Sequence, residues 1–144
     1  MHRLLCCIFF LHIFFLENSS AQLALEFDIN QKPSASAPRD FIQAGNVLYF
    51  LADDTTFGEE IWKHDLSNGI TSRVTDIQPG AIGANIDYLF LFQEAIYFDA
   101  QTSSGSRLHR LDPATEEVTV LQQGAAVRNP GSFVVYQDTL YFTA

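Results

Sequence analysis

The chain has 144 residues, with 17 acidic and 8 basic side chains and a formal net charge of −9 at pH 7. Its basic residues are scattered singly, and none form a stripe that could follow a phosphate backbone, which argues against nucleic acid and anionic membrane surfaces as partners. Its two cysteines, Cys6 and Cys7, both lie in an apolar N-terminal segment. The remainder therefore cannot be a disulfide-stapled scaffold and must rely on packing.

Residues 1–21 are predicted to be an export signal peptide. A short basic start precedes an almost uninterrupted apolar run over residues 4–16, and small residues lead up to an expected cleavage between Ala21 and Gln22. A membrane anchor is the alternative, but the 13 residues of this run fall short of the roughly 20 that cross a bilayer. We therefore expect an exported protein, extracellular, at the cell surface or periplasmic. Its mature part, residues 22–144, is predicted to have no membrane span.

The mature part contains one five-residue sequence motif three times, as Leu48-Tyr49-Phe50-Leu51-Ala52, Ile96-Tyr97-Phe98-Asp99-Ala100 and Leu140-Tyr141-Phe142-Thr143-Ala144. The steps between these copies are 48 and 44 residues. A period of this size indicates one supersecondary unit copied in tandem, each copy burying its apolar face against its neighbours.

The first unit is predicted to contain four strands. Residues 41–52 hold two β-rich runs about Gly45-Asn46 and predict a hairpin. A strand is expected over 60–64, and a turn separates it from another strand over 70–74.

The later units repeat this order without any stretch of helical periodicity. The expected elements are a hairpin over 88–100 around Gln93-Glu94, strands over 107–111 and 118–121 separated by a turn, and a hairpin over 133–144 around Gln137-Asp138.

The predicted fold class is all-β, with tandem four-stranded antiparallel repeats of 44–48 residues that correspond to β-propeller blades. A β-sandwich is the alternative, but it does not require the same four-strand unit in tandem. Residues 22–144 provide two repeats and a truncated third, whereas a closed propeller needs about four to eight blades. We expect an incomplete ring and the N-terminal fragment of a longer protein, whose remaining blades would be its partners. The alternative is a short chain that closes by self-association.

Gly58-Glu59-Glu60-Ile61-Trp62-Lys63-His64-Asp65 resembles the signature of the ELWxxDGT repeat proteins. The flanking residues 48–54 and 76–84 resemble that family's LYFxADD and DIxPGxxGS segments. The second unit departs from the pattern, because His109 stands at the tryptophan position and no DIxPG segment follows Leu121. The resemblance implies an exported bacterial propeller-like repeat protein. It bears on the fold more than on function, because activity in that family is mostly undefined.

The recurring aromatic residues are expected to form a repeat core, since they occupy the same place in each unit. A carbohydrate-stacking face is the alternative for the same side chains. The predicted core consists of Tyr49, Phe50, Trp62, Tyr97, Phe98, Tyr141 and Phe142.

Carboxylates crowd the loop around Gly58, and Asp53, Asp54 and Glu59 are candidate calcium ligands. Calcium binds six to eight oxygens, often from flexible loops, but the spacing here does not match the usual alternating ligand loop. A solvated acidic loop is the favoured interpretation, so no cofactor is predicted apart from this weak calcium candidate. Asp65 and Asp112, which recur after equivalent strands, are expected to fix turns through their carboxylates.

The sequence contains no catalytic motif and no histidine pair at metal-ligand spacing, so no catalytic residue is assigned. The function predicted here is binding or adhesion at the cell surface through propeller loops, with an unidentified protein or glycan as ligand. A hydrolase or lyase whose site lies in missing blades is one alternative, and a purely structural repeat array is another.

Overall fold

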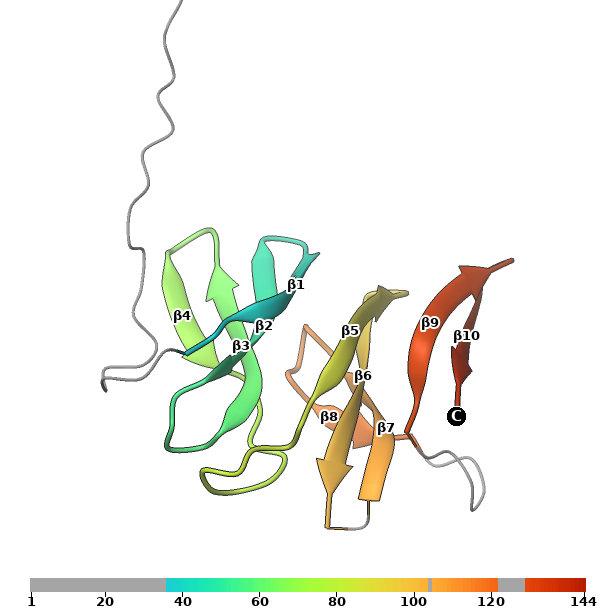
Figure 1. Ribbon diagram of the computed structural model, residues 1–144. Helices are drawn as coiled ribbons and strands as arrows, with labels where there is room; N and C mark the ends of the chain where they lie inside the picture. The colour runs from blue at the N-terminus through green and yellow to red at the C-terminus, as the bar shows by residue number, and fades with distance from the viewer. Residues whose placement is uncertain (1–35, 104, 122–128) are drawn as a thin grey trace, which may run out of the picture.

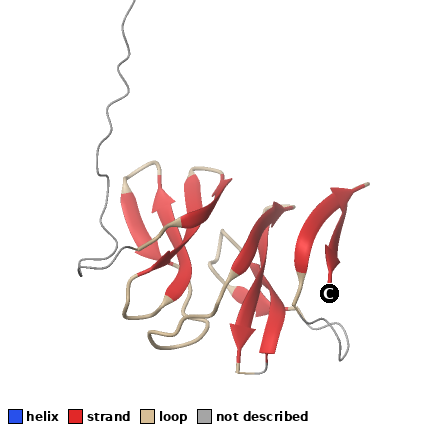
Figure 2. Cartoon of the chain, viewed as in Figure 1, coloured by secondary structure: helices blue, strands red, loops and turns tan. Residues whose placement is uncertain are grey.

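The structure is a computed structural model that describes residues 36–103, 105–121 and 129–144. The described residues form ten β-strands and no helix (Figure 2). They accordingly contain no helix that could cross a membrane. The predicted signal peptide and its cleavage site between Ala21 and Gln22 lie outside the described residues.

The strands form two four-stranded sheets and one hairpin, which follow one another in chain order (Figure 1). The first sheet has the order β1-β2-β3-β4, the second has the order β5-β6-β7-β8, and the C-terminal hairpin pairs β9 with β10. All pairings are antiparallel. The bounds are β1 Arg39–Ala44, β2 Val47–Asp53, β3 Glu59–Asp65, β4 Ile70–Arg73, β5 Asp87–Phe92, β6 Ala95–Thr102, β7 Gly105–Leu111, β8 Val118–Val120, β9 Gly131–Tyr136 and β10 Thr139–Thr143.

The all-β class and the antiparallel four-strand repeats are thus confirmed, and each predicted hairpin turn lies between two strands. Gly45 has a φ of 60°, while both residues of the Gln93-Glu94 and Gln137-Asp138 turns have positive φ. Two consecutive positive φ values are typical of a type I′ turn, whose twist matches that of the flanking strands.

A bulge recurs at the start of each hairpin and shows the repeat in the backbone. The ladder between the first two strands shifts register near Asp40, and equivalent shifts occur near Tyr88 and near Ser132. These three residues have φ values of 54°, 62° and 49°. These residues lie 48 and 44 positions apart, which are the same spacings as those between the copies of the repeated motif.

Each sheet has two different faces, because side chains alternate along a strand. We call one the phenylalanine face; it carries Phe50, Ala52 and Trp62 in the first sheet, Ile96, Phe98 and Ala100 in the second, and Phe133 and Phe142 in the hairpin. We call the other the tyrosine face; it carries Tyr49, Leu51 and Ile61 in the first sheet, Phe90 and Tyr97 in the second, and Val134, Tyr136 and Tyr141 in the hairpin.

The main core lies between the first two sheets. The tyrosine face of the first sheet packs there against the phenylalanine face of the second, in one buried cluster that includes Tyr49, Ile61, Ile96 and Phe98. The same pairing of faces recurs at the next interface, where the Phe133 ring lies 5.7 Å from Phe90. The described sheets stack in one direction but do not close into a ring.

Candidate functional site

The two segments that carry the family resemblance contact each other at one end of the first sheet. Gly58 and Gly83 approach back to back, since a Cβ added to Gly58 would lie 2.2 Å from the Gly83 nitrogen. Both glycines have positive φ, 70° and 68°. The contact therefore requires glycine at both positions, because a side chain would clash and would also strain the backbone.

Glu60 joins the same two segments through a buried carboxylate. Thr75 Oγ1 donates to Glu60 Oε2 at 2.5 Å, and the Ile77 N–H lies 3.2 Å from Glu60 Oε1. Thr75 Oγ1 in turn accepts from the Ile61 N–H at 2.9 Å. Burial raises the pKa of Glu60, and the hydrogen bonds from Thr75 and the backbone oppose that shift. This carboxylate stabilises the crossover to the second sheet.

Trp62 packs on the phenylalanine face beside Phe50 and Ala52. Its indole N–H donates to the Ala52 carbonyl at 3.1 Å. The polar end of the ring is therefore satisfied within the sheet. The residue is only 8% exposed, so its ring does not present an open face for stacking on a sugar.

The opposite end of the sheets carries the turns that the recurrent aspartates were predicted to fix. The Asp65 carboxylate accepts from the Ser67 N–H at 2.8 Å, and the Asp112 carboxylate accepts from the Ala114 N–H at 3.0 Å. Each bond reaches two residues along the chain, so the prediction is confirmed. These bonds lower the pKa of both aspartates, with the Ser67 hydroxyl as the largest cause at Asp65.

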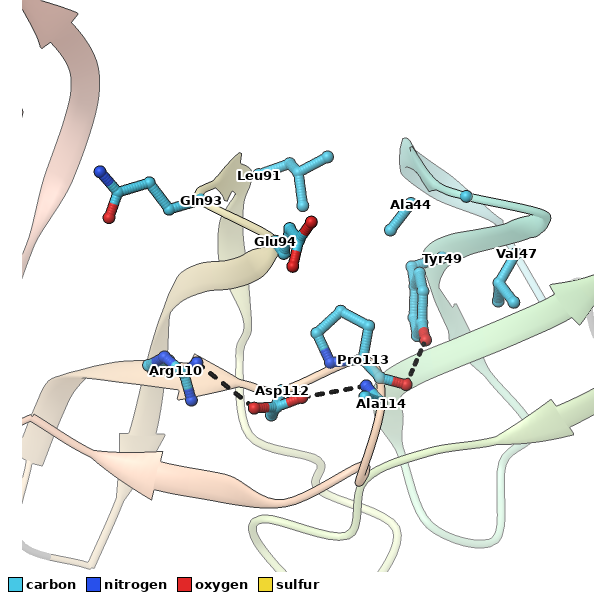
Figure 3. Close-up of a pocket in the computed structure, with 11 residues that line it drawn as sticks. Ala44, Val47, Tyr49, Leu91, Gln93, Glu94, Arg110, Asp112, Pro113 and Ala114 are labelled. Carbon is cyan, nitrogen blue, oxygen red and sulfur yellow. Dashed lines mark hydrogen bonds and ion pairs between the residues drawn. The ribbon is translucent and has the colours of Figure 1, made fainter. Parts of the chain in front are cut away.

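A cleft of about 610 Å³ opens between the first two sheets at this turn end (Figure 3). Its apolar wall comes from both sheets and from the β7–β8 turn, and a polar rim surrounds it. The apolar lining residues are Ala44, Val47, Leu91, Pro113 and Ala114, with Tyr49 at the base, and the polar ones are Gln93, Glu94, Arg110 and Asp112.

Hydrogen bonds and ion pairs fix the base and rim of the cleft. The Tyr49 hydroxyl donates across the two sheets to the Pro113 carbonyl at 3.5 Å. Burial raises the pKa of Tyr49, so this phenol remains a donor at neutral pH. Arg110 pairs with Asp112 at 3.4 Å. The Glu94 carboxylate sits on the exposed β5–β6 turn, which leaves the rim net acidic.

Arg39 clamps the first strands of the two sheets and was not identified from the sequence. Its Nη2 donates to Glu59 Oε1 at 2.8 Å, to the Ile86 carbonyl at 2.8 Å and to Asp87 Oδ1 at 3.3 Å. Its partners lie 20, 47 and 48 residues away in the chain, and no spacing in the sequence indicated them. The arrangement is an ion-pair network between sheets.

The structure does not bring the candidate calcium ligands together. Glu59 is held by Arg39, whose Nε also donates to Glu59 Oε2 at 3.0 Å. Asp54 accepts from the backbone N–H groups of its own turn, and Asp53 accepts from the Thr55 N–H. No group of three or more potential metal ligands converges among the described residues. The carboxylates of this loop therefore serve a turn and an ion pair.

The recurring aromatic residues lie in different environments. Tyr49, Phe50, Trp62 and Phe98 are buried, and Tyr97 and Phe142 are half-buried. Tyr141 is a correction to the predicted core, because it is 51% exposed whereas Tyr49 is 1% exposed. The physical reason is that a following sheet covers Tyr49, while no described strand covers the tyrosine face of the C-terminal hairpin.

The two described histidines have structural partners. The His109 ring stacks on Phe98 at 5.3 Å in the place where the first sheet has Trp62 beside Phe50. Burial lowers the pKa of His109. His64 Nδ1 lies 2.8 Å from Thr71 Oγ1.

No protein-family model, curated protein or solved structure matches this chain. Its function has to be inferred from the geometry of its own residues.

Proposed function

We propose that the chain belongs to an exported β-propeller-type repeat protein similar to the ELWxxDGT repeat proteins, and that it serves as a binding or adhesion module. The ligand site is the cleft between the first two sheets, and its ligand is a protein segment that presents an aliphatic side chain. The single observation that carries this proposal is the cleft itself, with an apolar wall and a polar rim.

The order of strands and the stacking of faces support the propeller. Each complete unit is a four-stranded meander, and successive sheets pair a tyrosine face with a phenylalanine face. The first strands of successive units contact each other, β1 with β5 and β5 with β9. Inner strands of radially set blades are arranged in this way.

The contacts between the signature segments support the family resemblance. Gly58 and Glu60 belong to one segment, while Ile77 and Gly83 belong to the other, and each pair is in contact. If the two segments fold as one unit, a repeat signature is expected to contain the residues of both segments together.

The chemistry of the cleft supports binding of a protein segment. Ligand pockets are concave and mostly apolar, with volumes of roughly 300–1,000 Å³ and a few placed polar groups. The volume of about 610 Å³ and the mixed lining of this cleft fit that description. Stacking of a sugar needs an open aromatic face, and Tyr49, the one aromatic ring among the described lining residues, is buried. An aliphatic side chain against Val47 and Leu91 suits the wall better.

The proposal is tested by NMR titration of the full chain, labelled with ¹⁵N, with N-acetyl-leucinamide. We expect saturable shifts of the Val47, Leu91 and Gln93 amide signals. The dissociation constant should be in the millimolar range, because about 12 non-hydrogen atoms at about 0.3 kcal/mol each give roughly 4 kcal/mol.

Matched variants decide whether those shifts report the cleft. Ala114→Trp fills the cleft and should abolish them, whereas Ala81→Trp, in the exposed crossover between the sheets, should leave them unchanged. Methyl β-glucoside is titrated in parallel. If only the glucoside causes shifts, the ligand is a glycan and not a protein segment. If neither probe causes shifts, the chain is a purely structural repeat array.

A further inference from the structure

The tyrosine face of the C-terminal hairpin exposes a patch of large apolar side chains. Val134, Tyr136 and Tyr141 are 55%, 62% and 51% exposed. They lie on the two paired strands β9 and β10, so the patch is continuous. Exposed apolar surface of this kind often marks an interaction site.

The repeat-equivalent residues of the first sheet are covered by another sheet. Ile42 and Ala44 occupy the positions of Val134 and Tyr136, and both pack against the core between the first two sheets. Tyr49 occupies the position of Tyr141 and belongs to that core itself. The exposed patch is thus the same kind of surface as one that is buried earlier in the chain.

The covering surface is the same at both interfaces within the chain. It is the phenylalanine face of the next sheet, and the large apolar residues of its first strand include one at an equivalent repeat position. At the first interface this residue is Leu89, which packs against the core. At the second it is Phe133, whose ring lies 5.7 Å from Phe90 and 6.4 Å from Tyr88.

The residue at the position of Leu89 and Phe133 in the first sheet is Phe41. Its ring stacks on Phe50 at 5.4 Å, but it is 57% exposed. No described sheet precedes the first one, so Phe41 lacks the contact that its two equivalents make.

We propose that the patch on β9 and β10 docks a second copy of this chain, head to tail, through β1 and Phe41 of that copy. In this arrangement β1 of the second copy lies beside β9 of the first copy. Within one chain, β5 lies beside β1 and β9 lies beside β5 in the same way. Phe41 packs on Val134, which is the repeat equivalent of Phe90. The contact continues the two interfaces within the chain and is heterologous, so it can propagate or close into a ring. It is independent of any ligand in the cleft.

Sedimentation velocity of the full chain over a hundredfold range of concentration tests the proposal. We expect the weight-average sedimentation coefficient to rise with concentration. Val134→Lys and Phe41→Lys should each abolish this rise, because one removes the patch and the other its partner. Ile82→Lys, at an exposed apolar residue of the crossover, is the matched control and should associate like the parent chain.

Mixing the two blocked variants identifies the geometry. A head-to-tail contact predicts that Val134→Lys and Phe41→Lys chains together form a one-to-one dimer and nothing larger, since each still has one intact surface. Tyr141→Lys should replace Val134→Lys with the same result if the latter unfolds. A parent chain that stays monomeric at every concentration would overturn the proposal. So would association that survives Phe41→Lys in a folded protein, because the patch would then pair with itself.

Discussion

At the scale of single residues, Glu60 is one of the groups that make the stability of this protein depend on pH. The pKa of Glu60 is raised in the folded state. At pH values between its unfolded and folded pKa, Glu60 therefore binds a proton when the chain folds. The stabilisation from the protonated carboxyl is therefore complete below the unfolded pKa. It is lost as the pH rises through the raised folded pKa.

Glu60→Gln keeps the shape and the acceptor oxygen but removes the titration. We expect the free energy of unfolding of this variant, relative to the parent chain, to increase as the pH rises through that window. The measurement is urea denaturation of both proteins at a series of pH values. Comparing the two at each pH cancels the opposite contribution of His109, whose pKa is lowered. A difference that does not vary with pH would show that Glu60 is not buried in the folded chain.

Trp62 is the second residue whose burial can be measured directly. Trp62→Ala should lower the free energy of unfolding by about 3–5 kcal/mol, because it empties the cluster around Phe50 and Ala52. Trp62→Phe should cost less, since it keeps an apolar ring and loses mainly the hydrogen bond to the Ala52 carbonyl. Denaturation of both variants checks this, and a loss under about 1 kcal/mol for Trp62→Ala would place the indole at the surface.

At the scale of elements, the join between the first sheet and its crossover depends on two glycines. Gly58→Ala should cost about 2 kcal/mol or more, because a Cβ there would strain a backbone with a φ of 70° and would collide with Gly83. Gly45→Ala is the matched control, because Gly45 has a φ of 60° but nothing within 4 Å of an added Cβ. It should cost only the backbone strain, about 1–2 kcal/mol. Thermal denaturation compares the two, and equal losses would contradict the close approach of the two segments.

The elements themselves were largely predictable from the sequence. Alternation of apolar residues located the strands, and the Gly45-Asn46, Gln93-Glu94 and Gln137-Asp138 pairs located the hairpin turns. Asp65 and Asp112 were predictable because an aspartate bonds to its own turn, which is a local interaction.

Glu60 shows where local reasoning failed. Its burial was not predicted, although it lies two residues before Trp62 and therefore on the same face of β3. That spacing indicated burial and could have been used. Its partners Thr75 and Ile77 follow only from the path of the crossover, which the sequence pattern does not determine.

At the scale of the whole molecule, the cleft could not be predicted because it depends on how two sheets sit against each other. Val47 and Leu91 are 44 residues apart and meet only when the tyrosine face of one sheet packs on the phenylalanine face of the next. The Arg39 network has the same origin, since it joins the first strands of two sheets. The repeat indicated that sheets would stack, but not which faces would meet.

We propose that the interface between the first two sheets forms one binding site for an aliphatic side chain. The most direct measurement is of intermolecular nuclear Overhauser effects from the methyl groups of N-acetyl-leucinamide to those of the protein. We expect effects to Val47 in the first sheet and to Leu91 in the second, at the same saturation. Effects to only one of the two sheets, or effects that persist in Ala114→Trp, would contradict it.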